Sequence, residues 1–342
     1  MYEKSYRGGN VFMKKIINDP KNVVDEMVQG LVRSYPEYLE RIPETGVVYR
    51  HDLKNIQGQV GIVSGGGSGH EPTHAGFVGD GMLSAAVCGE VFTSPTPDQI
   101  FEAIKKVDSG AGVFLVIKNY SGDVMNFEMA QDMAEMEDIK VKSIVVDDDI
   151  AVENSTYTQG RRGVAGTIFM HKVLGAAAAK GANLDELEQL AQKVLPNIKT
   201  IAVALSGATV PEVGKPGFTL GEDEIEYGVG IHGEPGYRRE KLQPSKALVE
   251  ELVGKLNQEF KFEKGDQVAV LVNGMGATPL MEQYIFMNDV LNKLADLGLE
   301  VKFTKVGSLM TSLEMAGISL TLFKVSDEIV ENLNYATDTI AW

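Results

Sequence analysis

One histidine of the 342-residue sequence stands among glycines, where almost no neighbouring side chain can pack a core. Glycine lets the backbone approach a small ligand that a side chain would block, and loops on rigid scaffolds commonly carry function. Apolar residues alternate at Ile225, Tyr227 and Val229, which predicts a short strand that ends at this loop. His232 is therefore a candidate functional residue, and a loop histidine bonded to backbone is the alternative. The run is Gly228-Val229-Gly230-Ile231-His232-Gly233-Glu234-Pro235-Gly236.

A second glycine run, SGGGSGHEP at Ser64–Pro72, follows the short apolar segment Val60–Val63 and predicts the order strand, glycine loop, helix. Backbone N–H groups near a helix start favour anions, so a phosphate cradle is one interpretation. The run lacks the lysine and hydroxyl of the P-loop and the spacing of the dinucleotide fingerprint, so ATP or NAD binding is not expected here. A tight turn explains the glycines but not the adjacent pair His70 and Glu71, which favours a ligand-binding role.

Lys118 and Asp123 follow the apolar run Val113–Ile117, which predicts a strand buried on both faces. At the start of a helix the ordinary role of Asp123 is to cap it, but a carboxylate on this sheet rim could also take a proton from a substrate hydroxyl. Lys118 either reaches a substrate oxygen or pairs with an acid. The run Asp147–Asp149 could bind a divalent metal through oxygen ligands. Three adjacent acids cannot all face one ion, which favours a solvated loop or a cap.

The remaining histidines fit no known metal or nucleophile pattern. His51, His74 and His171 have no matching acidic or cysteine spacing, and the sequence has neither a zinc-ligand motif nor H-E-x-x-H. A G-x-S-x-G elbow is also absent from the sequence. No metal is therefore expected in this chain, and the candidate residues indicate a small-molecule site without a cofactor.

Composition limits the classes of partner. Asp plus Glu number 48 against 32 for Lys plus Arg, and the net charge of −16 argues against nucleic acid or an anionic membrane as the principal partner. Cys88 is the single cysteine, so no intrachain disulfide is possible and a cytoplasmic location is expected. No apolar run reaches the roughly 18 residues that a membrane-spanning helix needs.

The alternation of strand and helix patterns predicts an α/β fold. Polar or glycine-rich residues close each strand of the first half, which predicts an open, mostly parallel sheet with helices on both faces and ligands beyond the strands' carboxyl ends. The pattern changes after Pro196, where a second α/β two-layer domain is expected. The predicted division is an extension or expression remnant at 1–12, a first domain at 13–196, and a second domain at 197–342 that carries the glycine-flanked histidine.

The candidate residues lie within six longer motifs: SGGGSGHEP (64–72), CGEVFTSPTPDQI (88–100), IKNYSGDVMNFEMA (117–130), VVDDDIAV (145–152), GRRGVAGT (160–167) and EYGVGIHGEPG (226–236). Together and in this order they resemble the substrate-binding K domain of the dihydroxyacetone kinase family. The resemblance covers essentially Met13 to the C-terminus. The family's helical, ATP-binding L domain has no counterpart here, so the chain is similar to the free-standing K subunit of the phosphotransferase-dependent enzymes.

The resemblance implies a role for each candidate residue. His232 matches the family's covalent histidine, whose ring nitrogen adds to the ketone carbon of dihydroxyacetone to form a hemiaminal. Asp123 and His70 match the active-site aspartate and the second histidine. Glu234 is expected, from its position alone, to hold the proton on the other ring nitrogen of His232. Further substrate contacts match Gly67, Ser94 and Lys118.

The resemblance also implies partners. ADP or ATP with magnesium is expected on a separate L subunit, where a phosphotransferase-system subunit rephosphorylates the nucleotide, and a homodimer is expected for the chain itself. The alternative is a paralogue that binds dihydroxyacetone and acts as a transcriptional coactivator. A pure carrier of short-chain carbonyl compounds is a third possibility. Retention of Asp123 and His70 beside the capturing histidine favours the kinase subunit.

Overall fold

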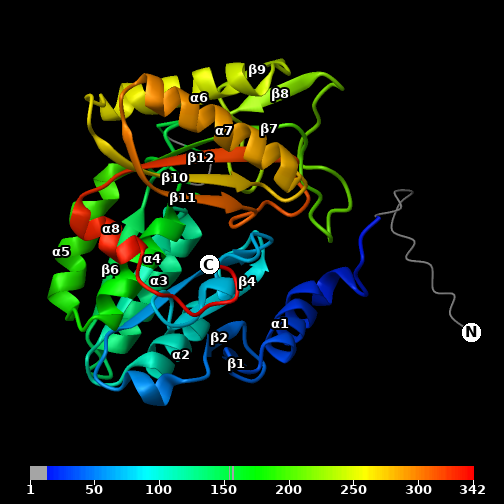
Figure 1. Ribbon diagram of the computed structural model, residues 1–342. Helices are drawn as coiled ribbons and strands as arrows, with labels where there is room; N and C mark the ends of the chain where they lie inside the picture. Colours follow the sequence, from blue (N-terminus) through cyan, green and yellow to red (C-terminus); the bar gives the residue numbers. More distant parts are fainter. Residues whose placement is uncertain (1–13, 154, 156–157) are drawn as a thin grey trace, which may run out of the picture.

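The computed structural model describes residues 14–153, 155 and 158–342, which form two sheets with helices packed on them (Figure 1). The extension predicted for residues 1–12 lies outside the described residues. The first sheet has the strand order β1-β2-β4-β3-β5-β6; β4, β3, β5 and β6 run parallel, and β1 and β2 extend it antiparallel. Its strands are β1 (Leu39–Arg41), β2 (Val47–Arg50), β3 (Gly61–Ser68), β4 (Ala85–Val91), β5 (Val113–Lys118) and β6 (Val141–Val146).

Helices cover both faces of the first sheet, as predicted. Side chains alternate along its strands, so that Val63 and Leu115 pack under α2 and α3, whereas Ile62 and Phe114 pack under α4. The helices of this half are α1 (Val23–Ser34), α2 (Pro97–Val107), α3 (Ser121–Glu135), α4 (Thr167–Ala179) and α5 (Leu184–Val194), with short 3-10 turns η1 (Pro20–Asn22), η2 (Leu53–Ile56), η3 (Ala75–Phe77) and η4 (Leu195–Asn197).

The second sheet has the order β11-β10-β12-β7-β8-β9, and only β10 and β11 are parallel. One face packs on α6 and α7, and the other packs on α4. The predicted short strand before the histidine loop is confirmed as β8. The elements are β7 (Ile198–Ala204), β8 (Glu224–Tyr227), β9 (Arg238–Lys241), β10 (Gln267–Gly274), β11 (Glu300–Gly307), β12 (Gly317–Lys324), α6 (Ser245–Phe260), α7 (Leu280–Asp296) and α8 (Asp327–Leu333).

Helix α4 lies between the two sheets and joins them into one core (Figure 1). Its Phe169 ring packs against Phe303 and Phe323 of the second sheet, with centroid distances of 6.3 and 5.5 Å. The same apolar cluster includes Phe114 of the first sheet. The chain passes from one sheet to the other between β6 and β7. The boundary at residue 196 stays a prediction, because this cluster spans both halves.

The order strand, glycine loop, helix predicted for residues 60–72 is wrong. β3 continues through the glycines to Ser68, and only the short η3 turn follows. The reason is close packing: a Cβ on Gly65 would lie 2.6 Å from the Val87 carbonyl oxygen, and a Cβ on Gly67 would lie 2.6 Å from the Thr93 nitrogen. The glycines let neighbouring backbone approach the strand where a turn was expected.

None of the described helices is both long enough and apolar enough to cross a membrane.

Candidate active site

His232 lies in the loop after β8, and Glu234 holds its side chain. Burial alone would raise the pKa of Glu234, but the neighbouring His232 and Arg162 outweigh burial and lower it to about 2. The resulting carboxylate can only accept hydrogen bonds. It accepts from the His232 ring Nδ1 at 2.9 Å and from the His232 backbone N–H at 2.9 Å. The expected contact is confirmed, and in a neutral ring it leaves the lone pair on His232 Nε2.

His70 follows β3 and meets His232 at the junction of the two domains. Its Nδ1 donates to the carbonyl oxygen of Thr311 at 2.7 Å, so in the neutral ring Nε2 carries the lone pair. Burial, followed by the nearby His232 and Lys118, lowers the pKa of His70 well below its ordinary value. His70 is therefore neutral, and its Nε2 lies 3.1 Å from Nε2 of His232.

When both rings are neutral, the two Nε2 atoms present lone pairs to the same small space. Two neutral rings in this geometry have no hydrogen to share between these nitrogens, because each ring proton is already on Nδ1. A ligand that brings an electrophilic carbon to one nitrogen and a hydroxyl to the other would satisfy both. The arrangement therefore suits a small hydroxylated carbonyl compound.

Two aromatic rings that the sequence reasoning missed hold the histidines in place. The Tyr120 ring packs edge-on against His232 at a centroid distance of 4.5 Å, and Phe92 does so at 5.1 Å. Phe92 also stacks on His70 at 5.2 Å. Both aromatics stand just beyond a strand's carboxyl end, and that position was the available signal. Their contacts limit rotation of the histidine rings.

Lys118 and Asp123 form a buried pair beside the histidines. Lys118 Nζ lies 3.6 Å from Asp123 Oδ2, and the two side chains are 0% and 3% exposed. Among the described residues, neither Lys118 Nζ nor Asp123 Oδ1 has a hydrogen-bond partner. The cap of α3 is Tyr120, without a side-chain bond, so the contacts do not support capping as the role of Asp123. Buried polar atoms are usually paired, which leaves these two available to a ligand.

A cavity of about 630 Å³ opens beside these groups, within the usual size range of small-molecule sites. Of the six predicted site residues, Gly67, Ser94, Asp123 and His232 line it. His70 and Lys118 lie behind its wall, in contact with His232 and Asp123 respectively. The structure thus brings all six together beyond the carboxyl ends of β3, β4 and β5, where the parallel sheet predicts a ligand. Their individual roles stay predictions. The lining residues are Gly67, Phe92, Thr93, Ser94, Tyr120, Ser121, Gly122, Asp123, Asn126 and His232.

Asp148 and Asp149 of the acidic run at 147–149 make buried contacts with other residues of the chain. Asp148 accepts from the backbone N–H groups of Val164 and Gly166, both at 2.8 Å, and so organises the start of α4. Asp149 pairs with Arg162 at 2.7 Å. Asp148 bonds the segment that leads into α4 and does not cap the helix itself, and both acids are buried, not solvated. Within the described part of the chain, no group of three or more His, Cys, Asp or Glu side chains could hold a metal ion.

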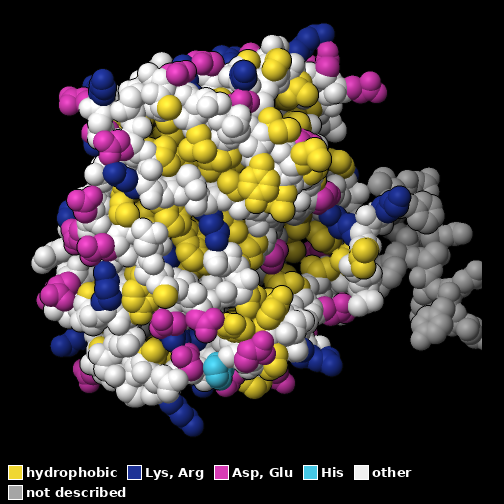
Figure 2. Space-filling model, in the orientation of Figure 1, with side chains coloured by type: hydrophobic (Ala, Val, Ile, Leu, Met, Phe, Trp, Pro, Cys, Tyr) yellow, Lys and Arg dark blue, Asp and Glu magenta, His cyan; other side chains and the backbone are white. Residues whose placement is uncertain are grey.

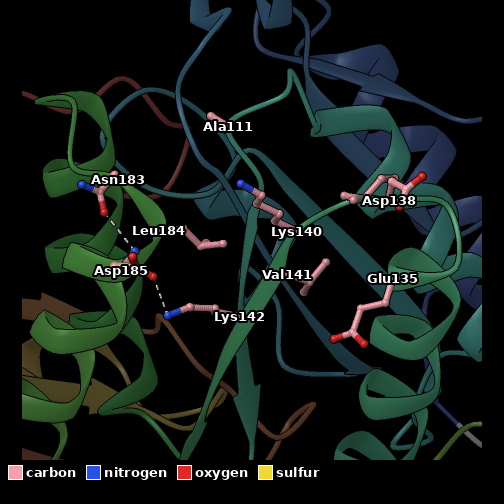
Figure 3. A pocket seen from close by; sticks show the side chains of 10 residues that line it. Ala111, Glu135, Asp138, Lys140, Val141, Lys142, Asn183, Leu184 and Asp185 are labelled. Carbon is pink, nitrogen blue, oxygen red and sulfur yellow. Dashed lines mark hydrogen bonds and ion pairs between the residues drawn. The ribbon is translucent and has the colours of Figure 1, made fainter.

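A second hollow, of about 660 Å³, lies along the edge strand β6 (Figure 3). Lys142 lines this hollow and forms ion pairs with Asp185 and Glu188, at 2.6 Å each. None of the predicted site residues lines it, and Lys142 and Asp185 form the one ion pair between its lining residues in the described part of the chain. The histidine cavity is therefore the candidate active site.

Fold and site together define the class of protein. A Dak1 domain matches residues 29–341, so the chain belongs to the Dak1 domain family, and the predicted resemblance to dihydroxyacetone kinases is confirmed.

Three relatives illustrate the range of this family. The dihydroxyacetone-binding subunit of the PTS-dependent dihydroxyacetone kinase from Lactococcus lactis is 64% identical over 330 residues, which are 96% of this chain and 99% of that protein. A coactivator of the DhaKLM operon from the same species is 47% identical over 331 residues, 96% of this chain and 100% of that protein. The solved dihydroxyacetone kinase of C. freundii, in complex with AMP-PNP and Mg²⁺, superposes with a TM-score of 0.88 at 34% identity, over 97% of this chain and 61% of that one.

Proposed function

We propose that this chain is the dihydroxyacetone-binding subunit of a phosphotransferase-dependent dihydroxyacetone kinase. One observation carries the proposal: His232 Nε2 faces His70 Nε2 at 3.1 Å beside a cavity, while Glu234 holds the other nitrogen of His232. The greater identity to the kinase subunit, 64% against 47% for the coactivator, supports this function over the regulatory alternative.

Capture begins at His232. Its Nε2 lone pair forms a bond to the ketone carbon and the carbon–oxygen π pair moves to the oxygen. That oxygen takes up a proton while the ring gives up its Nδ1 proton through Glu234, and a neutral hemiaminal results. The Glu234 carboxylate stabilises the positive charge that develops on the ring during the attack. Glycerol has the same hydroxyls but no electrophilic carbon, so covalent capture separates ketone from triol more sharply than hydrogen bonds alone could.

Phosphoryl transfer would use the buried pair. Asp123 accepts the proton of the substrate's terminal hydroxyl as that oxygen attacks phosphorus, and Lys118 steadies the charge on the oxygen. His70 accepts a hydrogen bond from a second substrate hydroxyl through Nε2. Lys118 Nζ and Asp123 Oδ1 have no hydrogen-bond partner among the described residues, and His70 Nε2 faces His232 Nε2 at 3.1 Å.

The phosphoryl donor is expected on a separate L subunit, as nucleotide with magnesium, which a phosphotransferase-system subunit recharges. The donor must enter at the cavity, so the partner must cover its rim. Asn126 of α3 lines the cavity, and on the same helix Met125 and Met129 are 60% and 50% exposed. Flexible methionines are common at binding surfaces. Met125→Lys with Met129→Lys should weaken L-subunit binding and leave dihydroxyacetone binding unchanged.

Met136→Lys is the matched control, because Met136 is 84% exposed but lies at the far end of α3. Equal loss of partner binding in the control would place the docking surface elsewhere.

The decisive test mixes the purified chain with L subunit, phosphotransferase donors and dihydroxyacetone. Formation of dihydroxyacetone phosphate supports the kinase subunit. Adduct formation without product would favour the coactivator, and binding without any pull-down of L subunit would favour a simple carrier. A cytoplasmic location, where such donors are available, accords with the single cysteine, Cys88.

A homodimer is also part of the proposal. Hydrophobic side chains gather over α7 (Figure 2). Single copies of soluble proteins rarely expose a large apolar patch. Sedimentation should show a dimer, and Met281→Asp with Ile285→Asp should give monomers; a monomeric parent chain would contradict this part. The exposed α7 residues are Leu280, Met281, Tyr284 and Ile285, each at least half exposed.

A further inference from the structure

Arg162 lies fully buried behind the histidine loop, in the motif at 160–167 that the proposed mechanism does not use. It comes from the first domain, in the segment before α4. Its Nε and Nη2 bind Asp149 Oδ2 at 2.8 and 2.7 Å. Nη2 also donates to the carbonyl oxygen of Gly228 at 2.7 Å. Gly228 begins the loop that carries His232, so a first-domain side chain fixes this second-domain loop.

The remaining nitrogen of Arg162 faces Glu234. Among the described residues Nη1 has no hydrogen-bond partner. A Cβ on Gly230 would lie 2.8 Å from this Nη1 and would collide with Glu234 Oε2, so the two groups flank the same spot. The absence of a side chain at Gly230 lets the guanidinium and the carboxylate lie side by side.

The charges around His232 explain why a cation is needed there. Glu234 on its own loop is an anion, and Asp149 adds a second negative charge behind it. Facing the ring from the first domain are His70, which is neutral, and Tyr120, whose hydroxyl burial keeps protonated. Lys118 and Asp123 stand further along the cavity as a pair. Without Arg162, the net charge next to the ring would be strongly negative.

We propose that Arg162 is the positioning residue that keeps His232 competent for capture, by fixing the loop through Gly228 and by balancing the charge of Glu234. A carboxylate without a balancing cation would favour protonation of the imidazole. The added proton would occupy the lone pair that must attack the ketone. The inference rests on the proposed capture of dihydroxyacetone. It also accounts for the two motifs, at 145–152 and 160–167, that contribute Asp149 and Arg162.

The test measures dihydroxyacetone affinity of the chain alone by calorimetry, from roughly pH 5 to 9, the range in which histidine titrates. Arg162→Met should weaken binding on the order of 100-fold at neutral pH, a loss typical of a misplaced reacting group, and should move the acidic limb of the profile to higher pH. Arg162→Lys keeps the charge but not the fork of hydrogen bonds. It should restore the position of the acidic limb and only part of the affinity.

Two further variants keep the test decisive. Arg161→Met is the matched control, since Arg161 is the neighbouring arginine but pairs with Glu153 and Glu259 at the surface; its affinity and pH profile should be those of the parent. If Arg162→Met fails to fold, the double variant Asp149→Asn with Arg162→Met removes both buried charges and is measured instead. A folded variant with parental affinity and an unmoved acidic limb would overturn the inference. A parent chain that binds no dihydroxyacetone would instead overturn the proposed function.

Discussion

The Asp123 carboxylate lies 3.6 Å from the Lys118 ammonium, beyond ordinary hydrogen-bond distance, so it can still accept a proton from a hydroxyl. Asp123→Asn keeps the shape of the side chain and removes its basicity. Because general-base action is typically worth about 10² to 10⁴ in rate, turnover should fall by that order while dihydroxyacetone still binds. Single-turnover assays with L subunit, together with calorimetry, check both parts. Turnover at the parental rate would remove Asp123 from the role of base.

His232 acts in capture, so its loss should affect affinity more than chemistry. His232→Ala should raise KM for dihydroxyacetone more than it lowers kcat, because the removed bond holds the substrate before phosphorylation. It should also reduce the discrimination against glycerol. His51→Ala is the control, as His51 is exposed and is not one of the residues that line the cavity. Substrate held equally well by the alanine variant, in intact-mass or crystal experiments, would contradict covalent capture.

Some residues of the candidate site could be predicted from the sequence, and others could not. His232 and Asp123 could be found because polar side chains among glycines, or just beyond an apolar strand, have few structural explanations. The contact of His70 with His232 joins positions 162 residues apart, and only the resemblance to a family placed them together before the fold was known. Phe92 and Tyr120 also stand just beyond a strand, but that signal is weak for them, because an aromatic residue at such a position is ordinary core material.

At the scale of elements, long apolar patterns made the buried strands predictable from the sequence. The short strands at the sheet edges have no such pattern. β5 is wholly buried and was predicted almost to its bounds from its apolar run. β1 and β9 are short, largely polar strands at sheet edges, and their pairing depends on neighbours that no local pattern specifies. The glycines of β3 were assigned to a loop because close approach of backbone and a turn have the same local composition.

Beneath β3, a buried histidine pair links the segment before η3 to α4. His74 Nδ1 lies 2.9 Å from His171 Nε2, and both side chains are almost fully buried. Burial, and then the charge of Lys118, lower the pKa of His171 from 6.5 to about 3. Burial likewise lowers the pKa of His74 well below its ordinary value. Both rings are therefore neutral in the folded protein near neutral pH.

This pair should make the fold acid-sensitive. Between about pH 6.5 and 3 the unfolded chain binds a proton at His171 that the folded chain does not, so the free energy of unfolding falls as pH falls through this window. Above pH 6.5 the contribution is fully present. His171→Gln should flatten the acid side of the stability profile, measured by urea unfolding from neutral pH downward. His51→Gln, at an exposed position, should leave the slope unchanged; equal slopes in all three proteins would contradict the prediction.

At the scale of the whole molecule, the C-terminal segment contacts both halves and so holds them together (Figure 1). Asp338 exchanges backbone hydrogen bonds with Asp80 at 3.1 Å, and the Ala341 N–H donates to Gly76 at 3.1 Å. These partners follow closely on the segment that carries His70. Trp342 stacks parallel to Phe303 of β11, with centroids 5.8 Å apart. The segment thus connects a loop of the first domain with the second sheet, and no local pattern in the sequence predicts this.

Lys172 of α4 anchors that segment from inside. Its Nζ donates to the Tyr335 carbonyl oxygen at 2.7 Å and to Thr337 Oγ1 at 2.6 Å. Hydrogen bonds from a charged donor are worth about 1.5 to 3 kcal/mol, so Lys172→Met should lower the free energy of unfolding by about 2 kcal/mol. Hydrogen exchange should rise in residues 335–342 and in the loop at 76–80. Denaturant titration and exchange mass spectrometry measure the two effects.

Lys293→Met is the matched control for this anchor. Lys293 pairs with Glu250 near the surface, and exposed pairs of this kind contribute about 0 to 1 kcal/mol. Its loss should leave exchange in the C-terminal segment at the parental rate. If Lys172→Met costs no more stability than this control, the segment is held by its backbone pairing and by Trp342 alone. The closure of the two halves would then depend on contacts at the end of the chain, not on α4.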